Sequence, residues 1–539
     1  MPAQPYPDKT SNILQQFDFA FSLSQQTING QLRNARDSWM EDIDGYDRVR
    51  AEAPDGSGVA TLDATLGELI VDLNASTLAA MRLEMPVMRG VLRSPAVGEF
   101  DLAGTTLRFT APLQRRPVAM PVLRAAAPEL ADKAQDVIDE LAMDSNMLSI
   151  EALYMDLTSM DRLTPLCVQQ DGTQHMPEAN VTAALLACLK ALAQQQPVLL
   201  QAVVLPKRHE QPSSFTLRNF DYKITPCEHN PDAATLDYLG VFWHGLEMPL
   251  PADLAAARAR LGPWVDPTRL DPTQGMRGGL LALRGELLAK SLAQTLKQAF
   301  DAAYARMNAD NRRRRDQGAV NNPGKDLPHP EAELLENVSV LAQGRRIEIR
   351  SSDGCNSYHW KDDNVSYALK KSLWLTLTPT AGAGYALRGA IVVDLQRERT
   401  VNFDIVSSAS SVITTGIEGS LDLNSPPDEL ECEVTTRLSL RFLAPNEVKT
   451  DNGNFWRSLL QVAVDYDQRM VSGFAADARQ AMEKMLDDVL DALNFDLGTL
   501  AIVPPGGGVF TFAGPRFSRQ DDLLLDIGYK AVMPQGEQP

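Results

Sequence analysis

The pattern of hydrophobic and polar positions changes abruptly near the start of the chain. Over Phe17–Leu23 large apolar residues alternate with small or polar ones, which is the period of a half-buried strand. Ser24 follows, a residue suited to cap a helix, and Ile28 and Leu32 then recur at helical spacing. We therefore predict a short strand that leads directly into an amphipathic helix.

A second change of this kind begins near residue 279. Apolar residues alternate with smaller or polar neighbours over 279–284, and helical spacing then continues through Leu288 and Leu292. Because this layout repeats that of the first unit, it indicates an internal duplication. We predict two related halves, residues 11–275 and 276–535, with tails at 1–10 and 536–539.

Further apolar runs after each unit predict additional strands. In the first half these runs lie at 67–73, 82–92, 100–109, 147–157 and 198–205, and a helix is predicted over 181–193. In the second half they lie at 338–349, 366–377, 385–395, 413–423 and 431–442. We therefore predict an elongated α+β fold in which curved antiparallel β-sheets are wrapped around long amphipathic helices.

The end of the chain adds the last predicted elements. A helix over 468–493 has an apolar stripe that includes Met485 and Val489. A hairpin is predicted between 501–503 and 509–512, because the segment between them is rich in Pro and Gly. A final strand is predicted over 522–529.

Charge narrows the classes of function. The 539 residues include 70 acidic and 51 basic side chains, which gives a formal net charge of −19. This balance argues against a nucleic-acid binder, which needs a basic surface. The one concentrated basic feature is Arg312, Arg313, Arg314 and Arg315, inside a polar loop predicted over 308–330. Two interpretations stay open: a solvated loop, or a contact for phosphate head groups or an acidic partner.

Residues able to carry chemistry show no spacing typical of a catalytic or metal site. The five cysteines and six histidines lack metal-ligand spacing, and neither a phosphate loop nor a nucleophile elbow is present. We therefore predict no cofactor and no enzyme activity; the competing hypothesis is a lipid hydrolase whose triad is assembled from distant residues. Since no secretory signal and no transmembrane segment is found in the sequence, we expect a cytoplasmic protein with reduced thiols.

Four segments resemble those of a known family. Phe17–Leu32 resembles the start of tubular lipid-binding (TULIP) domains. Arg82–Gly90, which contains Met85-Pro86, and the closing segments Gly508–Phe512 and Asp521–Tyr529 are similar to segments of the clostridial toxin-cluster "P forty-seven" and OrfX proteins. The resemblance implies a TULIP-like fold and binding of lipid or another hydrophobic small molecule, in a protein accessory to a toxin complex. It supplies no catalytic residues.

The expected site is an elongated apolar groove between the amphipathic helices and the concave sheet. Its expected lining comes from three helices and consists of Ile28, Leu32, Leu288, Leu292, Met485 and Val489. Burial of apolar surface stabilises such a complex by about 25 cal/mol per Å², so an acyl chain needs few polar contacts. The alternative is that these side chains fill the interior themselves, and that the protein binds a partner encoded in the same gene cluster.

Overall fold

The computed structural model describes most of the predicted elements. The described residues are 14, 17–42, 48–74, 80–126, 128–140, 148–155, 166–168, 174–175, 178–195, 198–206, 217–242, 251–261, 263–270, 278–302, 338–351, 357–362, 365–380, 384–401, 404–424, 435–453, part of 468–489, 502–503, 509–518 and 520–530. Every strand pairing within them is antiparallel, in three sheets of six, eleven and eight strands.

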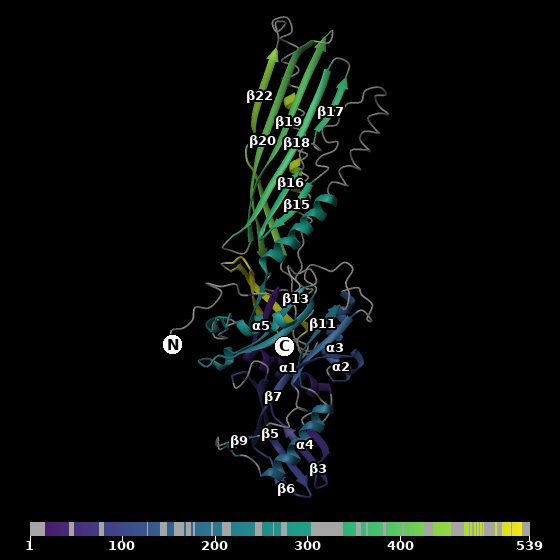
Figure 1. Cartoon of the computed structure of the whole chain (residues 1–539), viewed down its shortest axis with the longest axis vertical. Coiled ribbons are helices and arrows are strands. Elements are labelled where there is room, and N and C mark those ends of the chain that lie inside the picture. Colours follow the sequence, from purple (N-terminus) through teal and green to yellow (C-terminus); the bar gives the residue numbers. More distant parts are fainter. Residues whose placement is uncertain are drawn as a thin grey trace.

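The six-stranded sheet lies in the middle of the elongated molecule, between the other two sheets (Figure 1). Its order is β12 (Leu217–Thr225), β13 (Thr235–Phe242), β1 (Phe19–Ser24), β14 (Gly279–Leu283), β25 (Leu523–Lys530) and β24 (Val509–Phe517). The two strand-to-helix units thus meet at the centre of this sheet, where Phe21 of β1 lies opposite Leu281 of β14.

The strand β1 is buried on both faces, whereas its alternation predicted burial on one face only. Phe19, Phe21 and Leu23 belong to the large core cluster, which draws residues from all three sheets. Ala20 belongs to a second cluster that includes Trp264 and residues of α5 (Pro251–Arg260). The small side chain of Ala20 therefore leaves space for α5 and Trp264 to pack on the second face of β1.

The eleven-stranded sheet forms one end of the molecule. Its main order is β2 (Arg48–Pro54), β3 (Val59–Leu66), β5 (Ala80–Ser94), β7 (Thr105–Val118), β8 (Leu148–Met155), β11 (Val198–Pro206) and β23 (Ile502–Val503). Beside this path lie β4 (Ile70–Asp72), β6 (Gly98–Asp101), β9 (Leu166–Val168) and β10 (Gln174–His175). The helix α4 (Ala179–Gln195) contacts β2 and β3, and α2 (Met120–Ala126) contacts α3 (Pro128–Glu140).

The eight-stranded sheet forms the other end, where its long strands dominate Figure 1. Its order is β15 (Val338–Gln343), β16 (Arg346–Ser351), β18 (Val365–Pro379), β19 (Gly384–Val401), β20 (Asp404–Asn424) and β21 (Thr435–Phe442). In addition, β17 (Ser357–Asp362) pairs with β18, and β22 (Asn446–Gly453) pairs with β20. Inward positions of β18 and β19 are apolar, with Leu375 and Ile391 in the core cluster.

The structure confirms a mixed α+β fold of mostly antiparallel sheets, curled in part into a half-barrel. Among the described residues, the long helices wrapped by the sheets that the sequence predicted are not evident. The helix α1 (Gln25–Asp42) has 18 residues, and the helix that follows β14 is described over 285–302. The predicted last helix has helical residues between 468 and 489, and its predicted end lies outside the described residues.

Three local predictions differ from the structure. The single strand predicted over 338–349 is the hairpin β15–β16, because Gly344 has a φ of +61° and permits a tight turn that the alternating pattern conceals. The hairpin predicted near 501–512 does not form, since β23 pairs with β11 whereas β24 pairs with β25. The strand predicted over 67–73 is shorter, and only β4 forms there.

Candidate ligand-binding site

The helix 285–302 is positioned by the central sheet. It begins directly after β14, and its first N–H group, that of Gly285, donates a hydrogen bond to Oδ1 of Asp522 at 3.1 Å. A carboxylate at this position accepts from an N–H group that has no partner within the helix, and its negative charge is stabilised by the positive end of the helix dipole. Burial raises the pKa of Asp522, and the hydrogen bond from Gly285 opposes this shift.

The two faces of this helix differ in polarity. Leu288, Leu292 and Leu296 are buried in the core cluster, whereas Gln294, Lys297 and Gln298 are exposed. The helix therefore presents an apolar face to the sheet and a polar face to solvent.

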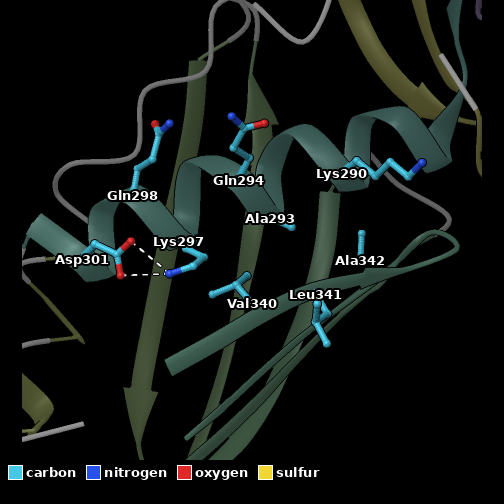
Figure 2. A pocket seen from close by; sticks show the side chains of 9 residues that line it. All are labelled: Lys290, Ala293, Gln294, Lys297, Gln298, Asp301, Val340, Leu341 and Ala342. Carbon is cyan, nitrogen blue, oxygen red and sulfur yellow. Dashed lines mark hydrogen bonds and ion pairs between the residues drawn. The ribbon is translucent and has the colours of Figure 1, made fainter. Parts of the chain in front are cut away.

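The strand β15 lies at the edge of the eight-stranded sheet and faces this helix (Figure 2). Val340 is buried, whereas the neighbouring Leu341 is 57% exposed. This alternation gives the strand one side in the core and one side in solvent. An edge strand with an exposed leucine leaves apolar surface available for contact.

A pocket of about 450 Å³ lies between the helix and β15. Its lining consists of Lys290, Ala293, Gln294, Lys297, Gln298 and Asp301 from the helix, and Val340, Leu341 and Ala342 from β15 (Figure 2). The alanine and valine side chains form an apolar base, whereas lysine and glutamine side chains come from the polar face of the helix. Nζ of Lys297 lies 3.0 Å from Oδ2 of Asp301, so this lysine is held by an ion pair one turn away.

The ionisable groups of the lining are two lysines and one aspartate. The nine residues supply no hydroxyl, thiol or imidazole group, and these are the commonest nucleophiles and bases of hydrolases. Elsewhere, burial raises the pKa of the Cys188 thiol to about 11, which leaves little thiolate at neutral pH. Among the residues that the structure describes, no group of three or more His, Cys, Asp or Glu is arranged to hold a metal ion.

The most deeply buried of the carboxylates is Asp237, which lies in the central sheet. Asp237 on β13 accepts hydrogen bonds from the hydroxyl groups of Ser22, Thr225 and Thr235. Its side chain is fully buried, and burial raises its pKa. Three donors around an inaccessible carboxylate indicate a structural contact between β1, β12 and β13.

The groove residues predicted from sequence lie beneath the surface. Ile28, Leu288, Leu292 and Val489 are between 0% and 3% exposed and belong to the large core cluster, and Leu32 packs against it. The cluster therefore brings together residues from all three predicted helices. Met485 and the loop arginines Arg312–Arg315 lie outside the described residues.

The pocket lining itself was missed by the sequence prediction. Lys290, Gln294 and Lys297 recur at helical spacing beside the apolar stripe, which is the signal for the border of an amphipathic helix. That signal does not show which strand lies opposite. The partner strand β15 was predicted only as part of a longer strand, so its edge position could not be recognised.

Comparison with known proteins finds structural similarities at low sequence identity. No protein-family model matches the chain, and no curated protein matches it. Its fold is similar to that of P47 proteins of Clostridium botulinum. The A2 protein is 10% identical, with a TM-score of 0.46 over 95% of this chain and 97% of the other. The E1 protein is 11% identical, with a TM-score of 0.47 over 95% and 98%.

A lipopolysaccharide binding protein is also similar in structure. It is 10% identical, with a TM-score of 0.27 over 96% of this chain and 100% of the other. The resemblance expected from the sequence thus has a structural counterpart over nearly the full length of the chain. Across the part of the chain that is described, no helix has the length and apolar content needed to span a bilayer.

Proposed function

We propose that this protein binds a lipid or another hydrophobic ligand without catalysing a reaction, and that the pocket between helix 285–302 and β15 is part of the site. One observation carries the proposal. Ala293 and Val340 line the pocket and also belong to the core cluster that contains Leu288 and Leu292. An aliphatic chain held there extends an existing apolar cluster, at a gain of about 25 cal/mol per Å² buried.

The size and rim of the pocket support an amphiphilic ligand. Its volume of about 450 Å³ falls within the range of roughly 300–1,000 Å³ found for small-molecule sites. Lys290 supplies an ammonium group at the rim and Gln294 supplies an amide, whereas Lys297 is paired with Asp301. Charge complementarity therefore favours an anionic head group above an apolar chain. Arg312–Arg315 are proposed as a further contact for such a head group.

The order of the central sheet supports the proposed division into two related halves, 11–275 and 276–535. One side of the sheet is β12-β13-β1, and the other is β24-β25-β14. Each side thus combines the strand that precedes a long helix with a later hairpin. We propose that each half packs its strands against the helix that follows β1 or β14.

A second candidate function is that of a structural accessory protein. Ile28, Leu288, Leu292 and Val489 are at most 3% exposed, as expected for an interior filled by its own side chains. Such a protein would bind partners through surface residues, for example the 47% exposed Trp374 on β18. A protein encoded in the same gene cluster is the proposed partner.

One experiment tests the proposed function directly. The full chain is purified from its host without detergent, extracted with organic solvent, and its bound lipids are identified by mass spectrometry. We expect at least one class of anionic lipid to be recovered in near-stoichiometric amount. Recovery of no lipid, together with no binding from a broad lipid panel, would contradict the proposal. Co-purification of a neighbour-encoded protein without lipid would favour the accessory function.

The absence of catalysis is tested separately. The same preparation is treated with activity-based probes for serine and cysteine nucleophiles. We expect no stoichiometric labelling. One residue labelled at a ratio near one probe per chain would support the lipid-hydrolase hypothesis instead.

A further inference from the structure

The eight-stranded sheet has an inner face in the core and an outer face turned away from it. Because residues paired across antiparallel strands share a face, the register assigns each outward side chain to a row across the sheet. Three large apolar side chains on the outer face are exposed: Trp374 by 47%, Leu443 by 36% and Val448 by 56%. Exposed apolar side chains gathered on one face indicate a surface for contact with another molecule.

One row crosses the middle of this face. It runs from Trp374 on β18 through Ala390 on β19 to Gly416 on β20, which are direct partners in the register. It continues to Leu443, whose N–H group donates to the carbonyl oxygen of Gly416 at 2.8 Å. A Cβ on Gly416 would lie 2.8 Å from Cδ1 of Leu443, so the leucine side chain lies over the glycine. The row thus has a large apolar side chain at each end and small residues between them.

The neighbouring row carries opposite charges on the two central strands. Arg388 on β19 lies directly opposite Glu418 on β20, and both side chains are exposed. The positive charge therefore stands on the side of the sheet that bears Trp374, and the negative charge stands on the side that bears Leu443. Since neighbouring strands lie about 4.8 Å apart, the two charges are equally far from a line drawn between β19 and β20.

This arrangement is complementary to itself. A two-fold axis along that line, in the plane of contact, places a second copy of the chain face to face with the first. Trp374 of one copy then meets Leu443 of the other, and Arg388 meets Glu418. Each contact occurs twice, because an isologous interface uses the same surface on both chains.

The rest of the charged row is compatible with this arrangement. Thr376 on β18 lies opposite Arg388, and Arg441 on β21 lies opposite Glu418. The same rotation places Arg441 of one copy against the uncharged Thr376 of the other. The row therefore brings no like charges together.

Other kinds of partner fit the outer face less well. Besides Arg388 and Glu418, the face bears Lys370 opposite Asp394, so fixed charges of both signs lie among its apolar side chains. A uniformly anionic membrane is repelled by the exposed Glu418. Fixed charges of both signs favour a protein surface with the matching arrangement, and the face itself offers that arrangement.

We propose that two copies of this chain associate through the outer face of the eight-stranded sheet, about a two-fold axis between β19 and β20. Trp374 packs against Leu443 of the second copy, and Arg388 pairs with its Glu418. The inference goes beyond the proposed function and does not rest on it, because it holds for a lipid carrier and for an accessory protein alike.

The first test measures association of the full chain by sedimentation velocity over about 1–100 μM. We expect a monomer–dimer equilibrium that depends on concentration. Trp374→Ala should raise the Kd of the dimer by about thirtyfold or more, because tryptophans at the centre of an interface contribute much of its affinity. Met88→Ala is the matched control, since Met88 is 63% exposed on β5 of the eleven-stranded sheet. It should change the Kd by less than about twofold.

The second test reverses the charges. Arg388→Glu and Glu418→Arg each place like charges at both contacts, so each variant alone should dimerise about tenfold more weakly or worse. An equimolar mixture of the two should restore the dimer, because every negative side chain of one copy then meets a positive one of the other. Arg93→Glu, at an exposed position on β5, is the control for charge reversal. Circular dichroism checks that all variants are folded.

The outcomes separate the parts of the proposal. A parent chain that stays monomeric overturns it, and binding of that monomer to phosphatidylglycerol vesicles through Trp374 would assign the face to a membrane instead. A dimer unaffected by Trp374→Ala and by both charge reversals overturns the choice of face. Two folded charge-reversal variants whose mixture stays monomeric overturn the two-fold arrangement.

Discussion

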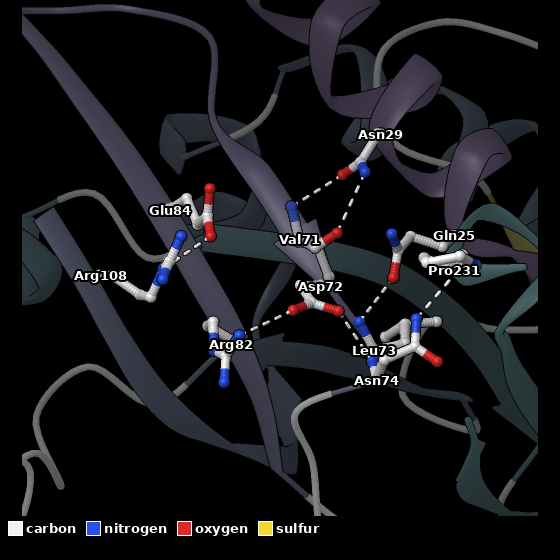
Figure 3. A network of polar contacts seen from close by, with 10 residues as sticks. All are labelled: Gln25, Asn29, Val71, Asp72, Leu73, Asn74, Arg82, Glu84, Arg108 and Pro231. Carbon is white, nitrogen blue, oxygen red and sulfur yellow. Dashed lines mark hydrogen bonds and ion pairs between the residues drawn. The ribbon is translucent and has the colours of Figure 1, made fainter. Parts of the chain in front are cut away.

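Asn29 on α1 and Val71 on β4 exchange two hydrogen bonds, at 3.0 and 2.8 Å, across 42 positions of sequence (Figure 3). Val71 is fully buried, so its backbone groups have no water to replace this partner. We expect Asn29→Ala to lower the free energy of unfolding by about 1–3 kcal/mol. Chemical denaturation measures the change. Gln26→Ala, on the exposed side of the same helix, should stay within about 0.5 kcal/mol of the parent chain.

Replacement by alanine is expected to change the free energy of unfolding in opposite directions at two glycines. A Cβ on Gly279 would lie 1.9 Å from the carbonyl oxygen of Ser22, at the centre of the six-stranded sheet. Gly279→Ala should therefore cost about 3 kcal/mol or more. A Cβ on Gly30 of α1 meets nothing within 4 Å, so Gly30→Ala should stabilise by about 1 kcal/mol through helix propensity. Thermal and denaturant unfolding of both variants checks the contrast; equal effects would contradict it.

The stability of the protein is expected to depend on the ionisation of Asp18. Burial raises the pKa of this carboxyl group from 3.8 to about 6, although the Phe242 N–H group and Arg284 oppose the shift. The folded state therefore holds a proton that the unfolded state releases. Its stabilising contribution is present below pH 3.8 and is lost as the pH rises through about 6.

Asp18→Asn tests this dependence, because its amide oxygen still accepts from Phe242. The variant should gain stability relative to the parent chain between about pH 4 and 6, by up to about 3 kcal/mol. Above that range the difference should be constant. Denaturation curves at several pH values measure it, and a difference that is independent of pH would contradict the assignment.

Lys290 is expected to recognise the charge of the ligand. Lys290→Glu should raise the Kd of a carboxylate amphiphile by about tenfold at low salt, since it reverses the charge at the pocket rim. The alcohol of equal chain length should bind with nearly unchanged affinity. A parallel loss for the alcohol would indicate damage to the apolar base of the pocket instead.

The loop arginines give a prediction that depends on ionic strength. If Arg312–Arg315 contact an anionic group, their replacement by serine should weaken binding most at low salt, because exposed charges are screened within about 10 Å at 0.1 M. Titration at two salt concentrations measures the effect. An affinity unchanged at both concentrations would return these arginines to the solvated-loop interpretation.

Local patterns predicted the elements better than their partners. The switch from strand to helix after Phe17–Leu23 could be predicted, because periods of two and 3.6 residues differ clearly. The strands β5, β8, β11, β18 and β19 were also placed close to their observed bounds. By contrast, the hairpins β2–β3 and β12–β13 were not predicted.

The contacts of α1 and of the candidate site could not be predicted, since they join distant segments. Asn29 is an ordinary polar residue of a helix until β4 is placed beside it. Similarly, Leu341 continues an apolar alternation in the sequence. Its position at a sheet edge is seen only in the structure, where β15 pairs with β16 and with no second strand of the described sheet. Tertiary placement, rather than local propensity, decides both cases.

The order of strands in the central sheet also determines how long a strand edge stays unpaired during translation. The strands β1, β12 and β13 are complete at Phe242, but β14 begins only at Gly279 and its second neighbour, β25, only at Leu523. Translation proceeds at about 5–20 residues per second. The edge of β1 that pairs with β14 therefore stays unpaired for roughly 2–7 s after Phe242 is made, and the edge of β14 that pairs with β25 stays unpaired for roughly 12–48 s. An unpaired apolar strand is a template for wrong pairing. The pace of the ribosome between residues 283 and 523 therefore governs how long the growing chain is at risk of aggregation.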